Sequence, residues 1–93
     1  MNSKTIKTLN PRTGDFLDND YVLSTPNDLN EKVLDAQLAF TVYRNTSGNE
    51  RAILLETIAE EIEAVKEEIL DMTTLETGLP AGRIIGETGR TIG

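Results

Sequence analysis

The sequence contains no cysteine and no histidine, and each absence excludes a kind of chemistry. Without cysteine there is no disulfide framework, no thiol nucleophile and no iron–sulfur site. Without histidine the commonest general base and the commonest metal ligand are also missing. The 93 residues can form one small domain at most, and its core is thin because so short a chain buries only about 60–70% of its surface. This composition is a poor basis for a self-sufficient enzyme.

Basic residues are few, with 9 lysines and arginines against 16 acidic residues and a formal net charge of −7. This balance argues against nucleic acid and against anionic membranes, since both are bound through basic side chains. No apolar run approaches the roughly 20 residues that a membrane span needs. The N-terminus lacks the apolar stretch of a secretory signal. We therefore expect no nucleic-acid or membrane partner, and a cytoplasmic location.

Residues 4–24 carry the pattern of a β-hairpin or a meander. Short stretches with strand propensity flank a turn cluster at residues 10–15. In this cluster Pro11 restricts φ and Gly14 permits a positive φ. Two strands alone are marginally stable in water, so the hairpin is expected to lie on another element.

Two amphipathic helices are expected next, over residues 26–43 and 48–72. Thr25 and Ser47 are typical N-cap residues, and each is followed three positions later by an acid that completes a capping box. The loop between the helices is short, so we expect them to pack antiparallel as a helical hairpin. The apolar side chains expected to pair the two helices are Leu29, Val33, Phe40, Leu55, Ile58, Ile62 and Ile69.

Residues 80–93 are expected to form a third helix or an irregular tail. Gly82, Gly86, Gly89 and Gly93 recur at spacings of 4, 3 and 4, which would place them on one helix face. Each interior glycine costs a helix roughly 0.5–1 kcal/mol relative to alanine. Close packing of this face against another element would justify the glycines. Neither glycine-rich nucleotide-binding fingerprint is present.

The acidic residues are weak candidates for a metal site. Glu56, Glu60, Glu63 and Glu67 share one face of the second helix, but metal sites in helical bundles combine glutamate with histidine. Residues 18–20 resemble the opening of a calcium loop, yet Val22 stands at the next ligand position and the required glycine is missing. We expect a solvated acidic face and no metal.

Arg83 and Arg90 are seven residues apart and would share one face of a helix. Two arginines so placed could hold a carboxylate or a phosphate through paired hydrogen bonds. The alternative is a pair of surface or interdomain salt bridges. On the sequence alone the salt bridges are favoured, since exposed arginines seldom bind ligands.

The order of several short motifs resembles one known family. The motifs are Asn10-Pro11-Arg12-Thr13-Gly14, the helical segment 36–40 with Tyr43-Arg44, Ser47 with residues 50–55 and Ile58-Ala59, and Glu76-Thr77-Gly78-Leu79-Pro80. Over about residues 6–93 they resemble the N-terminal segment of an aldehyde dehydrogenase. The ending, with Arg83, Gly86-Glu87, Arg90-Thr91 and Gly93, is similar to 2-oxoglutarate semialdehyde (2,5-dioxopentanoate) dehydrogenases and NADP-linked fatty aldehyde dehydrogenases.

The resemblance implies a parent enzyme with an α/β, Rossmann-like fold that oxidises an aldehyde to a carboxylic acid with NAD or NADP. In this family a cysteine attacks the aldehyde, hydride passes to the nicotinamide, and a glutamate-activated water releases the acid. These groups lie downstream in the family, so no catalytic or cofactor-binding residue is assigned here. Only Arg90 is retained, as a candidate for substrate binding.

Residues 1–93 would then be a single partial domain, a mostly helical fragment that is inactive alone and binds no cofactor. Its implied partner is the remainder of the parent enzyme. Its exposed apolar faces are expected to cause self-association. The alternative is a complete, small, acidic helical-hairpin module that binds a basic or apolar partner. The two hypotheses differ in whether the reading frame continues past Gly93.

Overall fold

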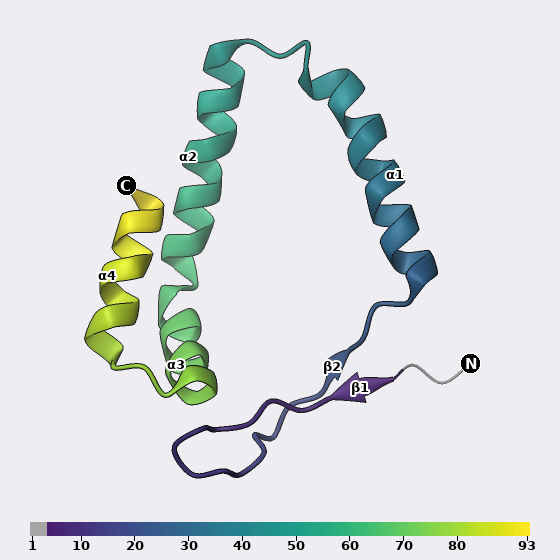
Figure 1. The fold of residues 1–93 in the computed structure, drawn as a ribbon. Helices are drawn as coiled ribbons and strands as arrows, with labels where there is room; N and C mark the ends of the chain where they lie inside the picture. Colours follow the sequence, from purple (N-terminus) through teal and green to yellow (C-terminus); the bar gives the residue numbers. More distant parts are fainter. Residues whose placement is uncertain (1–3) are drawn as a thin grey trace.

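A computed structural model describes residues 4–93 (Figure 1). The elements are, in chain order, β1 (Thr5–Ile6), β2 (Tyr21–Val22), α1 (Pro26–Tyr43), α2 (Gly48–Ala64), α3 (Lys66–Thr77) and α4 (Ala81–Ile92). The expected fold class, mostly helical with an N-terminal hairpin, is confirmed. The segment after Pro80 is a regular helix and not an irregular tail.

The hairpin consists of a short antiparallel pair and a long connection. β1 pairs with β2, with Thr5 opposite Val22 and Ile6 opposite Tyr21. The turn at residues 10–15 closes where the Asn10 N–H donates to the Asp15 carbonyl at 2.9 Å. Gly14 has a φ of +79° there, as the sequence predicted for this glycine. The expected hairpin and its turn are therefore confirmed.

Both predicted capping boxes are present. The Thr25 hydroxyl accepts a hydrogen bond from the Asp28 N–H at 3.1 Å, and the Asp28 carboxylate accepts one from the Thr25 N–H at 2.9 Å. Ser47 and Glu50 repeat this arrangement at the start of α2, at 3.1 and 3.3 Å. These contacts satisfy backbone N–H groups that a helix start leaves without a partner.

The helix expected over residues 48–72 is two helices that extend to residue 77. Val65, with φ of −112° and ψ of 13°, leaves helical geometry between α2 and α3. The apolar spacing of Ile62, Val65 and Ile69 continues across this break. No proline or glycine marks the break, so the sequence pattern could not reveal it. At its other end α3 terminates at Gly78, whose φ is +71°.

The expected packing of the first helix on the second is wrong. The two run in opposite directions, but they diverge from the loop at residues 44–47, and α1 lies along no other helix in the described part of the chain (Figure 1). Leu29, Phe40 and Leu55 are 60%, 56% and 64% exposed. A short loop fixes the relative direction of two helices, but it does not bring their faces into contact.

The packing that forms involves α4. This helix lies against both α2 and α3 (Figure 1). Ile84 of α4, at 7% exposed, is the single buried apolar residue among residues 4–93. The apolar side chains of α4 gather on one face, whereas α1 carries a second apolar row, Leu34, Leu38 and Val42, opposite its first. A helix with one apolar face can bury it against elements on one side. Burial of both apolar rows of α1 would need packed elements on two opposite sides.

The whole molecule is an open frame one helix thick. The hairpin, α1, α2 and α3 form its sides, with α4 against α2 and α3 (Figure 1). The extents are 49 × 40 × 15 Å and the radius of gyration is 17.6 Å, against about 12 Å for a compact domain of this length. A hydrophobic core requires two packed layers. A single layer leaves the apolar side chains on both faces exposed.

Candidate functional site

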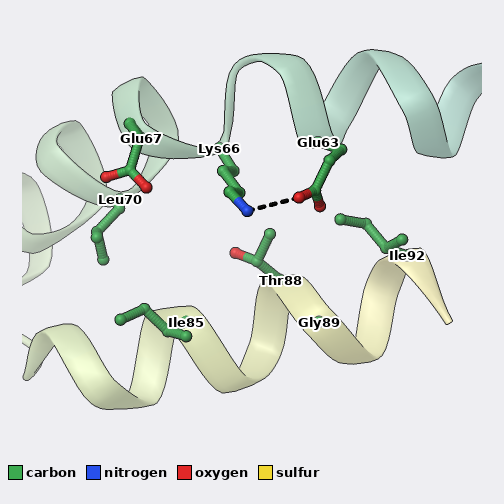
Figure 2. A pocket seen from close by; sticks show the side chains of 8 residues that line it. All are labelled: Glu63, Lys66, Glu67, Leu70, Ile85, Thr88, Gly89 and Ile92. Carbon is green, nitrogen blue, oxygen red and sulfur yellow. Dashed lines mark hydrogen bonds and ion pairs between the residues drawn. The ribbon is translucent and has the colours of Figure 1, made fainter.

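An apolar cleft bordered by charged residues lies between α4 and the α2–α3 junction. Its volume is about 350 Å³, and Figure 2 shows the side chains around it. Its lining residues are Glu63, Lys66, Glu67, Leu70, Ile85, Thr88, Gly89 and Ile92. Leu70 and Ile85 lie at one end, and Ile92 lies near the other (Figure 2). The cleft is therefore an apolar groove with charged groups along one side.

The charged side of the cleft is an ion pair that spans the break in the helix. The Lys66 ammonium donates to the Glu63 carboxylate at 2.5 Å, and both side chains are about half exposed (Figure 2). The hydrogen bond to Glu63, and then the attraction of its charge, raise the pKa of Lys66 above its ordinary value. Lys66 is thus held as a cation, and a protonated amine is not a nucleophile.

The hydroxyl group that lines the cleft, that of Thr88, is hydrogen-bonded within its own helix. The Thr88 hydroxyl donates to the Ile84 carbonyl of its own helix at 2.8 Å. No base in the described chain is hydrogen-bonded to that hydroxyl to activate it. The cleft can therefore accommodate an apolar group, but its side chains do not form a catalytic arrangement.

Arg83 and Arg90 lie where the sequence placed them, on one exposed face of α4. Neither forms a salt bridge within residues 4–93, where the ion pairs are Lys7 with Asp20 and Lys66 with Glu63. The salt bridges favoured from the sequence are thus not formed inside this part of the chain. Arg90 is in the last turn of α4, and its assignment to substrate stays a prediction.

The acidic face of α2 and α3 is exposed to solvent, as the sequence predicted. Glu56, Glu60, Glu63 and Glu67 are exposed on α2 and α3. Asp20, from the segment that resembles a calcium loop, instead pairs with Lys7 at 3.1 Å. Among the described residues no group of three or more acidic side chains could hold a metal ion. The same residues include no helix long and apolar enough to cross a bilayer.

The expected close packing of the glycine face is not formed. A Cβ added at Gly82, Gly86 or Gly89 would meet nothing within 4 Å. The face of α4 that packs on α2 and α3 carries Ile84 instead. Isoleucine gains more from burial than glycine does, so the apolar face of α4 is the one that turns inward.

Sequence reasoning missed one contact between distant segments. The Arg12 guanidinium donates two hydrogen bonds to the carbonyl of Gly78, at 3.1 Å from Nε and 2.8 Å from Nη2. Residues 10–14 and 76–80, two of the motifs that carried the family resemblance, are therefore adjacent in space. A basic residue in one turn and a helix-ending glycine far away in sequence gave no pairing signal.

Comparisons with known proteins identify the family. The aldehyde dehydrogenase family matches residues 1–93. Two similar proteins are alpha-ketoglutaric semialdehyde dehydrogenases, 34% identical over 96% of this chain in Azospirillum brasilense and 34% identical over 99% of it in Acinetobacter baylyi. A mitochondrial succinate-semialdehyde dehydrogenase from Arabidopsis thaliana is 33% identical over 91% of the chain.

These similarities cover a small part of each relative. The matched region spans 17%, 18% and 16% of the three relatives in the same order. No solved structure matches the chain. The family match nevertheless extends over every residue and agrees with the motifs at residues 10–14 and 76–80. The chain belongs to the aldehyde dehydrogenase family.

Proposed function

We propose that these 93 residues are the N-terminal segment of an NAD(P)-dependent aldehyde dehydrogenase whose substrate is a semialdehyde, such as 2-oxoglutarate semialdehyde. The family match and the names of the similar proteins support this proposal. Within such an enzyme, residues 1–93 are a single partial domain. The cytoplasmic location expected from the sequence stays a prediction.

The role of the segment in this proposal is structural, and the observation that carries it is the exposed surface. The chain exposes 7775 Å², whereas a compact monomer of 10.2 kDa exposes about 5,300 Å². The excess exceeds the roughly 800 Å² that each partner buries in a standard interface. The remainder of the parent enzyme is the partner that supplies the second layer, on which the apolar rows of α1 and α2 are buried.

The chain alone is expected to be inactive. The family forms its covalent intermediate with a thiolate, and the sequence contains no cysteine. Lys66, the amine beside the cleft, is held in its protonated form by Glu63. NAD or NADP would accept the hydride in the parent enzyme, and the segment contributes no group to that transfer.

The test of the function compares the 93-residue chain with the full reading frame. Each is mixed with 2-oxoglutarate semialdehyde and either NAD or NADP, and absorbance of the reduced cofactor is followed. We expect turnover from the full-length protein and none from the chain above a heat-treated control. Silence of the full-length protein with both cofactors would overturn the proposed function. Turnover by the chain alone would overturn its structural role.

Arg90 is proposed to attract the carboxylate of the semialdehyde, because its guanidinium is exposed and no carboxylate within residues 4–93 pairs with it. In the full-length enzyme Arg90→Gln should raise KM for the semialdehyde and leave KM for an uncharged aliphatic aldehyde unchanged. Arg83→Gln is the matched control, because Arg83 lies seven residues before Arg90 on the same face of α4. It should leave KM for both aldehydes unchanged. Equal effects on both aldehydes would remove Arg90 from the substrate site.

A further inference from the structure

The contact between Arg12 and Gly78 joins segments that are 66 residues apart in sequence. The Arg12 Nε and Nη2 atoms both donate to one oxygen, the Gly78 carbonyl, at 3.1 and 2.8 Å. Gly78 is the residue at which α3 ends. The last carbonyls of a helix have no partner within the helix and carry partial negative charge, so a guanidinium is well matched to this position.

The two segments also fit each other in shape. A Cβ placed on Gly78 would lie 3.3 Å from Cγ of Pro11 and 3.4 Å from Cγ of Arg12. The turn at residues 10–14 thus rests against the side of Gly78 that a side chain would occupy. Glycine serves two needs here, since its φ of +71° also favours a residue without Cβ.

The position of this contact in the frame gives it a specific role. The packed pairs of elements are β1 with β2, α3 with α4, and α2 with α4. Each pair lies within one of two units, the hairpin followed by α1 or the helices α2–α4. The chain connects these units at the loop of residues 44–47, at the far end of α1 from the hairpin (Figure 1). Arg12 and Gly78 connect them a second time, on the opposite side of the frame.

We propose that the Arg12–Gly78 contact closes the frame and fixes the orientation of the hairpin unit relative to the helical unit. While it is made, the hairpin unit and the helical unit are held at two points and keep one relative orientation. When it is broken, the hairpin and α1 move away together about the loop at residues 44–47, and both units keep their secondary structure. This inference is independent of the enzymatic proposal.

The test exploits the absence of cysteine, because two introduced cysteines can be spin-labelled without background. Labels at Asp18→Cys on the hairpin and Glu60→Cys on α2 report the distance between the units by pulsed electron resonance. The labelled chain is diluted with unlabelled chain at low salt, so that distances between associated copies are not recorded. We expect a narrow distance distribution in the otherwise unchanged chain. Arg12→Ala should broaden it towards longer distances, and Arg12→Lys should do so less, since lysine keeps the charge but loses the two-donor fork.

Gly14 provides a matched control for Gly78. Both glycines have a positive φ, +79° and +71°, so alanine is strained at either position. An added Cβ meets nothing within 4 Å at Gly14 but meets the hairpin turn at Gly78. Gly78→Ala should therefore broaden the distribution and Gly14→Ala should not. A label pair within the helical unit, Glu60→Cys with Glu87→Cys, should be unaffected by all of these substitutions.

Three outcomes would overturn the proposal. The first is a broad distribution in the chain that retains Arg12 and Gly78. The second is an unchanged distribution in Arg12→Ala, or equal broadening in Gly14→Ala and Gly78→Ala. The third is a loss of helical circular dichroism in Arg12→Ala, which would mean that the contact is needed for folding and does not merely orient two folded units.

Discussion

The hydroxyl oxygens of Thr25 and Ser47 each accept a hydrogen bond from a backbone N–H at the start of the following helix. In return, the N–H of each of these two residues donates to the carboxylate of the acid three positions later. Such contacts depend on residues three positions apart. They form as soon as the local chain becomes helical, and they need no distant partner. This is why the sequence alone located both helix starts correctly.

Removal of either cap should destabilise its helix by about 1 kcal/mol. The expected measurement is a lower midpoint of denaturant unfolding for Thr25→Ala and for Ser47→Ala, followed by helical circular dichroism. Thr57→Ala is the control, since its hydroxyl donates only to the Ile53 carbonyl inside α2. An equal loss in the control would show that the caps make no special contribution.

Asp28 makes the start of α1 sensitive to acid. The hydrogen bond from the Thr25 N–H, and then that from the Thr25 side chain, hold the pKa of Asp28 below its ordinary value of 3.8. A carboxyl with a lowered pKa in the folded state stabilises that state above its ordinary pKa. The contribution is lost as the pH falls through the lowered value.

The helical signal of α1 should therefore decrease below about pH 4, as the carboxylate is protonated. Asp28→Asn should remove this component of the acid transition, and Asp35→Asn, in the middle of the same helix, should retain it. The chemical shift of the Thr25 amide proton, followed during acid titration, gives the most direct measurement. A shift that does not change between pH 5 and pH 2, or that changes equally in Asp28→Asn, would contradict this assignment.

Among the helices, α4 differs from α1 because its apolar side chains gather on one face. This face includes Ile84, Ile85 and Ile92, and the arginines lie outside it. The one-sided pattern allows α4 to be covered by α2 and α3 of the same chain. The two opposite rows of α1 do not allow this, and no residue of α1 is buried.

Substitutions on the two helices should differ accordingly. Ile84→Ala should cost about 2–5 kcal/mol of unfolding free energy, because it removes a buried side chain between three helices. Leu55→Ala, expected from the sequence to be as damaging, should change stability in the isolated chain by about 0.5 kcal/mol or less, because Leu55 is 64% exposed. Chemical denaturation of both variants tests this order. A reversed order would mean that α1 and α2 pair in solution.

At the scale of the whole molecule, the open frame lacks a second layer. The exposed apolar side chains include Leu34 and Val42 on α1 and Phe16 on the hairpin, at 56%, 72% and 71%. Exposed apolar side chains in this number favour contact between chains. The net charge of −7 opposes such contact, and salt screens that repulsion.

The isolated chain should therefore self-associate, and more strongly at high ionic strength. Light scattering at low and high salt measures the mass of the species directly. Leu38→Glu places a charge in the second apolar row of α1 and should weaken association, while Gln37→Glu, beside it but outside that row, should have less effect. A monomer of 10.2 kDa that melts cooperatively at all salt concentrations would contradict this prediction.

The sequence by itself determined the features that depend on neighbouring residues. These are the hairpin turn at residues 10–15 and the starts of α1 and α2. For residues 80–93 the sequence left a helix and an irregular tail both open. The absence of cysteine excluded a thiol nucleophile within these residues. The order of the short motifs indicated the family. Capping, turn geometry and periodicity act over a few residues, so they can be read without knowing which distant segments meet.

Only the tertiary structure decided which faces are covered. It showed that α4 and not α1 packs on α2, that the glycines of α4 are not in close contact with a neighbouring element, and that Arg12 reaches Gly78. Apolar periodicity indicates which face of a helix favours burial. This chain has more apolar faces than neighbouring elements that could cover them. The outcome depends on the summed burial and geometry of all the elements together, which no local pattern contains.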